Sequence, residues 1–254
     1  HSGEKAISTY FSEGKGLALK GQLSPMEWED LTHFEGNANA FRLLTHQFLG
    51  RRKGGFVMTY STLASIVKYP YPSILAGKKS KFGYFVSEMD DYLKIAEELG
   101  IKRLSTEGEV PLYARHPLVF LVEAADDICY QMMDIEDAYK LKLLTPRETK
   151  ELYQLFLSEK QKARVDEVFR LVSDENEQIA YLRATVIGIL VKECTKVFME
   201  NENSILEGTF EGALIKHINA PLNEAYKRCT QVAVEKIYRS RDVLDIELAG
   251  FHVI

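Results

Sequence analysis

Residues Leu118–Tyr139 read LVFLVEAADDICYQMMDIEDAY, and this stretch decides the fold of the chain. It predicts a helix that is apolar almost all the way round, as a helix buried in a protein interior is. The same stretch carries several acids, and Asp126 and Asp134 lie one helical turn either side of Tyr130. At about 100° per residue, these three side chains fall within roughly 80° of one another, stacked over about 12 Å of helix.

A carboxylate inside a protein costs several kcal/mol unless a cation or hydrogen-bond donors compensate for its burial. The predicted helix therefore needs positive charge beside its acids. A bound metal ion, a cluster of lysines and arginines, or both would supply this charge. The alternative is an ordinary helix whose acids pair with arginines of neighbouring helices, and the pattern alone leaves that alternative open.

The composition of the 254 residues is that of a soluble globular protein, with 46% hydrophobic and 27% charged residues. A formal net charge of −5 argues against a general nucleic-acid binder, so no stable nucleic-acid partner is expected. No apolar run reaches the about 18 residues of a membrane span, so no membrane partner is expected either. The three widely spaced cysteines are interpreted as reduced core residues of a cytoplasmic protein.

Hydrophobic periodicity predicts helices nearly throughout, and the residues that precede prolines predict a loop over residues 68–85. A short β-prone piece surrounds residues 110–113, and nothing repeats like a sheet. The predicted helices are Gly3–Phe11, one starting at Ser24, Glu35–Leu49, Thr59–Val67, Val86–Glu98, Leu118–Tyr139, one starting at Thr145, Glu151–Val172, Asn176–Glu200 and Asn219–Leu248. No linker interrupts them. The prediction is an all-α fold with residues 1–254 in a single domain, cut from a longer protein at both ends.

Polar residues outside the central helix are candidates for chemistry. His1 and Glu4 are three residues apart and share a helical face. A carboxylate beside an imidazole raises its basicity and suits general acid–base catalysis. His33 precedes a helix with Asn37 and Asn39, which are poor helix formers. The alternatives are a surface pair for the first two residues and local capping of the helix for the other three.

A lysine-rich segment follows between Lys68 and Ser87, where lysines alternate with aromatic residues and no acid occurs. Mobile cations next to aromatic rings suit a polyphosphate and a base. The alternative is a solvated loop, which is the interpretation for Lys78 and Lys79. No Walker loop, GxGxxG, GxSxG or paired-cysteine metal motif is present.

Several stretches together resemble the deoxynucleoside triphosphate triphosphohydrolases of the HD superfamily, the bacterial dGTPase-like group. In the order of the family they are HSGEKAI, HFEGNANAFRLL, KYP followed by KKSKFGYFVSE, HPLVFLVEAADDICYQMMDIEDA and YRSRDVLDIELAG. EAADDICY followed by DIEDA is the specific one. The resemblance implies an HD-type helical fold.

The segment His1-Ser2-Gly3-Glu4 resembles the tail of the family's HD signature. The resemblance therefore implies that the His-Asp dyad and an earlier His ligand lie upstream of residue 1, and that the HD fold is incomplete at both ends. Of the four family metal ligands, the last matches Asp126. One aspartate cannot complete a site of two His and two Asp ligands, so this piece by itself is expected to be inactive.

The family reaction is hydrolysis of a dNTP, such as dGTP, to a deoxynucleoside and inorganic triphosphate. The resemblance implies a divalent metal ion (Mn, Mg or a similar transition metal) that Asp126 helps to hold and that polarises the α-phosphate and its attacking water. His1 would be the general acid to the 5′-oxygen, with Glu4 orienting it. Tyr130 would pack under the deoxyribose, and Asp134 would accept a hydrogen bond from the 3′-hydroxyl.

The resemblance also places substrate-binding residues in the first third of the chain. Asn37, Lys68 and Lys81 match positions that contact the phosphates, and His33 would be an active-site neighbour. Two alternatives stay open: another HD-family nucleotide phosphohydrolase, and a catalytically inactive nucleotide-binding helical protein. Family members form closed oligomers, so a cytoplasmic homo-oligomer acting in nucleotide-pool control is expected.

Overall fold

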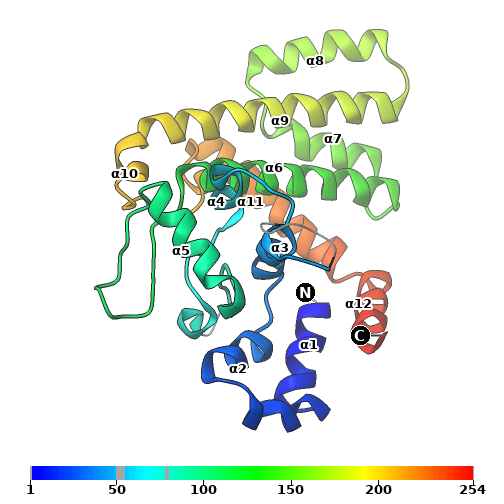
Figure 1. Cartoon of the computed structure of the whole chain (residues 1–254). Helices are drawn as coiled ribbons and strands as arrows, with labels where there is room; N and C mark the ends of the chain where they lie inside the picture. Colours follow the sequence, from blue (N-terminus) through cyan, green and yellow to red (C-terminus); the bar gives the residue numbers. More distant parts are fainter. Residues whose placement is uncertain (1, 50–54, 78–79, 254) are drawn as a thin grey trace. The chain divides into compact units, whose positions relative to one another are not determined.

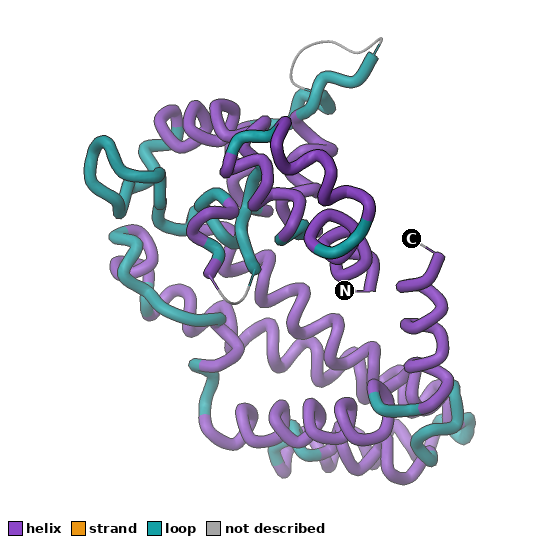
Figure 2. The backbone as a smooth tube through the Cα atoms, turned by 90° about the horizontal axis from the view of Figure 1, so that it is seen from below, coloured by secondary structure: helices purple, strands orange, loops and turns teal. Residues whose placement is uncertain are grey.

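A computed structural model describes residues 2–49, 55–77 and 80–253. Within these ranges the backbone forms helices and loops and contains no strand, so the predicted all-α class is confirmed (Figure 2). The predicted β-prone piece forms an isolated antiparallel bridge, between Arg103 and Tyr113. In the same part of the chain, no helix has both the length and the apolar character needed to cross a membrane.

The chain divides into two compact units. Unit 1 comprises His1–Val122, Asn203–Phe210 and Glu247–Ile254, and unit 2 comprises Glu123–Glu202 and Glu211–Ile246. The long helix of the acidic stretch crosses from the first unit into the second. Each unit is defined by the contacts within it. The single domain over residues 1–254 stays a prediction.

Short helices build unit 1 (Figure 1). They are α1 (Ser2–Ser12), η1 (Lys15–Gln22), α2 (Pro25–Thr32), α3 (Gly36–Thr45), α4 (Tyr60–Ile66), η2 (Ser73–Leu75), η4 (Val86–Glu88) and α5 (Met89–Glu98). The predicted start of α2 is confirmed, because Ser24 and Glu27 form a reciprocal capping box. The predicted helix Glu35–Leu49 ends earlier than expected, at Thr45.

Aromatic side chains of residues 82–85 hold the lysine-rich segment against the core of unit 1. The buried rings of Tyr84 and Tyr92 stack with their centroids 4.6 Å apart, and Phe82 is fully buried in a second cluster. Between them, a Cβ on Gly83 would lie 2.1 Å from the carbonyl oxygen of Tyr69, so only glycine permits this approach. The packing therefore fixes the backbone that follows Lys81.

Longer helices build unit 2. They are α6 (Pro117–Lys140, which begins in unit 1), α7 (Pro146–Gln154), α8 (Glu159–Leu171), α9 (Glu175–Glu200), η5 (Leu214–Lys216), α11 (Ala220–Val232), the π-helical η6 (Ala233–Tyr238) and α12 (Arg241–Val253, which ends in unit 1). The short helix α10 (Glu202–Leu206) begins at the last residue of the first segment of unit 2 and otherwise belongs to unit 1. Helix α7 packs against both α9 and α11. The predicted helix Glu151–Val172 is wrong in its continuity, because Ser158 caps a new helix there.

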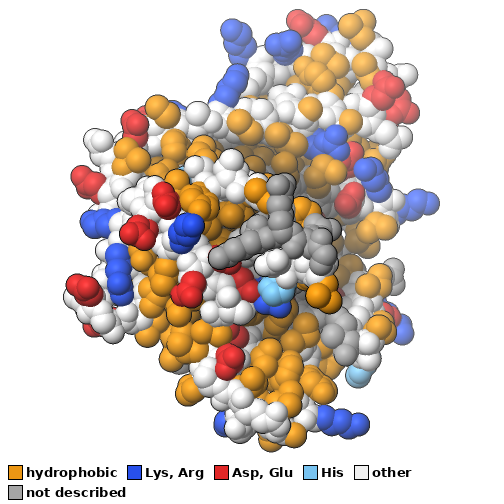
Figure 3. Space-filling view, viewed as in Figure 1, with side chains coloured by type: hydrophobic (Ala, Val, Ile, Leu, Met, Phe, Trp, Pro, Cys, Tyr) orange, Lys and Arg blue, Asp and Glu red, His pale blue; other side chains and the backbone are white. Residues whose placement is uncertain are grey.

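Helix α6 is buried on one side only, which differs from the expectation of a helix buried all round. Ile128 and Met132 are at most 1% exposed, whereas Tyr130 is 59% exposed and Met133 is 38% exposed. Cys129 is also exposed, unlike the buried Cys194, and all the described cysteines are free. Figure 3 also shows hydrophobic side chains at the surface, between acidic and basic groups.

Candidate functional site

A carboxylate of α1 contacts the first turn of α3 directly in unit 1. Glu4 Oε1 accepts a hydrogen bond from the backbone N–H of Gly36 at 2.8 Å. A Cβ on residue 36 would lie 2.8 Å from the same oxygen, so the glycine makes room for this contact. The first N–H groups of a helix lack partners within it and favour negative charge. The contact therefore holds Glu4 at the N-terminus of α3.

Glu35 lies at the centre of this region and is only 1% exposed. Its Oε2 accepts from the backbone N–H of Asn37 at 3.0 Å and from Asn37 Nδ2 at 2.9 Å. Its Oε1 accepts from Lys81 Nζ at 2.5 Å. Lys81 Nζ also lies 4.0 Å from Glu4 Oε2. The structure thus brings together three of the predicted site residues, and we call Glu4, Glu35, Asn37 and Lys81 the Glu35 cluster.

Neighbouring carboxylates raise the pKa of Lys81. Partial burial lowers its pKa, but the hydrogen bond that Lys81 donates to Glu35 and the negative charges of Glu35 and Glu4 outweigh burial and raise the pKa above its ordinary value. The side chain is 29% exposed, so its ammonium group reaches solvent. Lys81 therefore presents a permanent positive charge to an anionic ligand.

The other predicted residues of the first unit have different surroundings. His33 Nδ1 lies 2.9 Å from Glu29 Oε2 and 3.3 Å from the Glu29 carbonyl oxygen. The imidazole therefore contacts α2, the helix that His33 ends. Lys68 Nζ lies 5.8 Å from the centre of the Tyr69 ring. His1 lies outside the described residues.

Helix α6 places Asp126, Tyr130 and Asp134 on one face of unit 2, as their spacing predicts. Asp126 is exposed and makes no hydrogen bond or ion pair with any described residue. The carboxylate of Asp134 accepts a hydrogen bond from the hydroxyl of Tyr238. The ring of Tyr238 also stacks on that of Tyr130, with the centroids 6.5 Å apart and an angle of 25° between the planes.

The pKa values of both Asp134 and Tyr238 are raised in the folded protein. Burial raises the pKa of Asp134, the Tyr238 hydrogen bond partly opposes this, and the charge of Asp137 adds to it. Burial, followed by the bond to Asp134, raises the pKa of Tyr238. The phenol therefore stays neutral at physiological pH and donates a hydrogen bond to the carboxylate.

Another acid of α6 follows the alternative left open by the sequence. Glu136 is 7% exposed and forms an ion pair with Arg183 of α9. Lys140 approaches it as well, at 3.5 Å from Glu136 Oε1. The helix therefore uses Glu136 to join helices, whereas Asp126 and Asp134 contact no arginine among the described residues.

Two residues of these clusters were missed by reasoning from the sequence. Glu35 and Tyr238 both lie inside stretches that carry the family resemblance, HFEGNANAFRLL and YRSRDVLDIELAG. Those matches were the available signal. Local spacing offered none, because Glu35 meets Lys81 and Tyr238 meets Asp134 only through tertiary packing.

Asp126 is the residue of the described chain whose fit to a metal ion the sequence predicts. Asp126 offers an exposed carboxylate that has no ion pair with the described residues, and carboxylate oxygen is the ligand that Mg²⁺ and Mn²⁺ prefer. No three His, Cys, Asp or Glu side chains converge on a common point within the described ranges. Asp126 therefore fits the role of one ligand among several.

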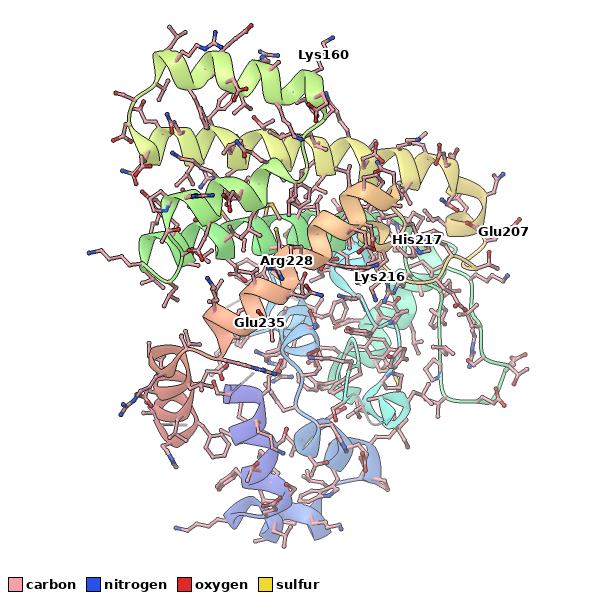
Figure 4. All side chains as sticks on the ribbon, turned by 180° about the vertical axis from the view of Figure 1, so that it is seen from behind. Lys160, Glu207, Lys216, His217, Arg228 and Glu235 are labelled. Atoms are coloured by element: carbon pink, nitrogen blue, oxygen red, sulfur yellow. The ribbon has the colours of Figure 1, made fainter. Side chains whose placement is uncertain are left out.

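A hollow of about 620 Å³ on unit 2 is a weaker candidate. It is lined by Asp127, Ile215, Lys216, Asn223, Tyr226, Lys227, Thr230 and Gln231. Figure 4 shows Lys216 just before α11 and Arg228 farther along that helix. The polar lining is largely committed to the fold, since Tyr226 donates to the Asp127 carbonyl and Thr230 donates to Gln131.

The fold and these clusters define an all-α protein with a lysine suited to phosphate and a helix face suited to a cation. No family model matches the chain. A deoxyguanosinetriphosphate triphosphohydrolase-like protein of Pseudomonas aeruginosa is 34% identical over 248 residues, which cover 95% of this chain and 54% of that protein. A protein of the same name from Synechocystis sp. is 33% identical over 267 aligned residues, covering 100% of this chain and 58% of that protein.

The resemblance to the dGTPase-like family is thereby confirmed: the chain is homologous to that family over nearly its whole length. It spans about half the length of the curated relatives it matches.

Proposed function

We propose that this chain takes part in the metal-dependent hydrolysis of a dNTP, of the dGTP type, to a deoxynucleoside and inorganic triphosphate. The observation that carries the proposal is the exposed face of α6. There Asp126 has no counter-charge among the described residues, and Asp134 is held by a neutral phenol. Acids that served only to join helices would pair with cations, as Glu136 does with Arg183.

The Glu35 cluster would bind the phosphates. Lys81 has three N–H donors, and its hydrogen bond to Glu35 is the one it makes with the described residues, so it can also donate to an oxyanion. Asn37 lies in the first turn of α3, where the helix dipole favours negative charge. Lys68 would add a second cation, as the family match implies. His33 would be a neighbour of the site.

The sugar would bind at α6. Tyr130 is exposed and offers a flat ring against which a deoxyribose can pack, which disfavours a 2′-hydroxyl. Asp134 already accepts a hydrogen bond from the hydroxyl of Tyr238, and the 3′-hydroxyl of a sugar can donate to the second oxygen in the same way. The two residues would thus read the deoxy character of the substrate.

The proton for the leaving group would come from His1, and Glu4 would orient its ring. Such an acid contributes typically about 10²–10⁴ in rate. Asp126 would ligate a divalent ion, which when bound would polarise the α-phosphate. A single carboxylate does not hold such an ion tightly, so the proposal requires ligands in addition to Asp126.

Product analysis tests the proposal and separates it from its alternatives. Protein that spans the full length of the relatives is incubated with Mn²⁺ and each dNTP, with the 254-residue chain in parallel. Release of inorganic triphosphate supports the proposal. Release of phosphate or pyrophosphate would favour another HD-family phosphohydrolase, and binding without turnover would favour an inactive nucleotide-binding protein.

Two substitutions test the assigned roles in the active protein. Asp126→Ala should abolish metal binding, and retained activity would refute its role as a ligand. His1→Ala should lose turnover while substrate binding is largely kept, and an unchanged kcat would refute the acid role. The homo-oligomer and the cytoplasmic location belong to the same proposal, and sedimentation analysis tests the oligomer.

A further inference from the structure

Glu35 is an unusual residue for its position in the fold. It is the N-cap of α3, and its side chain accepts from the Asn37 N–H. The other described helices with such a side-chain cap use Ser, Thr, Asp or Asn, which are the preferred N-caps. A glutamate here buries a charge that capping alone does not require. A second function of this carboxylate is therefore expected.

The hydrogen bonds of Glu35 show what that function is. One carboxylate joins Asn37 in the first turn of α3 to Lys81 in a loop 46 residues from Glu35. Its two oxygens accept from the backbone N–H and Nδ2 of Asn37 and from Lys81 Nζ. Asn37 and Lys81 are both proposed phosphate contacts. The same buried group therefore orients two residues that would act on one anion.

We propose that Glu35 is a positioning residue for phosphate binding, which aims the Lys81 ammonium and the Asn37 amide at the same anion. This inference rests on the proposed function, in which Lys81 and Asn37 contact the phosphates. A free lysine loses much rotamer freedom when it binds a phosphate. A lysine already held by Glu35 loses less, so the same contact gives tighter binding.

Glutamine cannot replace Glu35 in this role. A carboxylate accepts on both oxygens, whereas an amide has one acceptor and one donor group. In Glu35→Gln, either Lys81 or Asn37 must face an N–H₂ group and lose its hydrogen bond. The variant should still fold, because it removes a buried charge and leaves Lys81, which is 29% exposed, able to reach water.

Glu88 provides a matched control in the same unit. It is 2% exposed, forms an ion pair with Arg42 at 2.6 Å, and is the N-cap of α5. It therefore shares with Glu35 the burial, the cationic partner and the position at a helix start. Arg42 and Glu88 have no part in the proposed site. The Glu88 side chain makes no capping hydrogen bond, so Glu88→Gln reproduces the loss of a buried charge and of its ion pair, without the loss of a cap.

The test measures binding of inorganic triphosphate by isothermal titration calorimetry, with the thermal unfolding midpoint as a readout of stability. We expect Glu35→Gln and Lys81→Met each to weaken binding about tenfold or more. The double variant should bind no more than about twofold worse than Lys81→Met, because both changes remove one coupled interaction. Glu88→Gln should bind within about twofold of the unchanged protein, although its melting temperature changes too.

The outcomes separate the inference from the function on which it rests. If Lys81→Met weakens triphosphate binding but Glu35→Gln does not, Glu35 has only a structural role and the inference is overturned. If the unchanged protein does not bind triphosphate, or Lys81→Met binds as well as it does, the proposed phosphate role fails first. Should Glu35→Gln unfold, Glu35→Asp keeps the charge on a shorter side chain, and wild-type affinity in that variant would also overturn the inference.

Discussion

The buried acids of unit 1 and the acids on the open face of α6 are treated in opposite ways by the fold. Glu35 and Glu88 are at most 2% exposed, and each has a cation within 2.6 Å. On α6, the exposed Asp126 has no cation among the described residues, and Asp134 has only the hydroxyl of Tyr238. A buried charge requires compensation by the protein, whereas an exposed charge remains available to a ligand.

Asp30 is an exception, because this buried acid has no ion pair with the described residues. It is 5% exposed, and its Oδ2 accepts only from the backbone N–H of Val86, at 2.7 Å. Burial raises its pKa from 3.8 to about 6, although Ser73 and the Val86 N–H oppose the shift. Burial, with the nearby charges of Glu88 and Glu27, thus changes the titration of this carboxyl.

The largest expected effect comes from removing the cation of a buried pair. Lys81→Met leaves the buried Glu35 carboxyl without its cation, and should lower the free energy of unfolding by about 3 kcal/mol at pH 7. Urea denaturation measures it. The double variant Glu35→Gln/Lys81→Met should recover most of the loss, because no buried charge remains. A double variant as unstable as Lys81→Met would contradict the account of compensation.

The next effect is a pH dependence at Asp30. Its pKa is higher in the folded state, at about 6, than the ordinary 3.8, so the folded protein binds the proton more tightly. Stability from this group is therefore greatest at low pH, falls as pH rises between about 4 and 6, and stays lower above. Each pKa unit corresponds to about 1.4 kcal/mol, so the fall is about 2–3 kcal/mol.

Asp30→Asn should remove this slope, and the variant should be more stable than the unchanged protein at pH 7. The check is a set of urea melts between pH 4 and 7, with Asp126→Asn as the control that keeps the slope. Identical slopes in Asp30→Asn and the unchanged protein would show that Asp30 does not carry the effect.

A smaller effect is expected on α6 from Tyr238→Phe. It removes the hydrogen bond to Asp134, which is partly exposed, and should cost about 1 kcal/mol of stability. Since that hydrogen bond opposes the raised pKa of Asp134, the variant should raise this pKa further. Carboxyl ¹³C NMR across a pH titration measures the shift. A lower Asp134 pKa in the variant would show that the hydroxyl does not stabilise the carboxylate.

The smallest expected effect belongs to Asp126→Asn. Its side chain is exposed and has no hydrogen bond or ion pair with the described residues, so the free energy of unfolding should change by less than about 0.5 kcal/mol. Urea denaturation without added metal ions measures this. A loss as large as that of Lys81→Met would show that Asp126 serves the fold and is not held open for a ligand.

The sequence predicted most helices, and its errors have physical causes. Capping at Ser24 and Thr145 was recognisable because the residues of a capping box lie within one turn. The break between α7 and α8 was missed, because apolar residues continue at helical spacing across it. In the structure α7 ends at Gln154, and Ser158 caps the start of α8. The predicted helix Asn219–Leu248 is α11, η6 and α12 in succession.

The candidate site also has one part that the sequence predicts and another that it does not. The common face of Asp126, Tyr130 and Asp134 follows from helical spacing alone. The pairing of Glu35 with Lys81 could not be predicted, because 46 residues and several turns separate them. Nor could spacing show that Glu136 pairs with Arg183 while Asp126 stays open.

By itself the sequence determined the helical class, the acidic face of α6 and the family to which the chain is homologous. These properties depend on residue types and on spacings within a few turns, which a helix converts directly into geometry. Only the tertiary structure decided which carboxylates are compensated and which are open. Burial and counter-charge depend on groups that are distant in sequence and meet only when the chain packs, so Glu35 and Asp126 look alike in the sequence and differ in the fold.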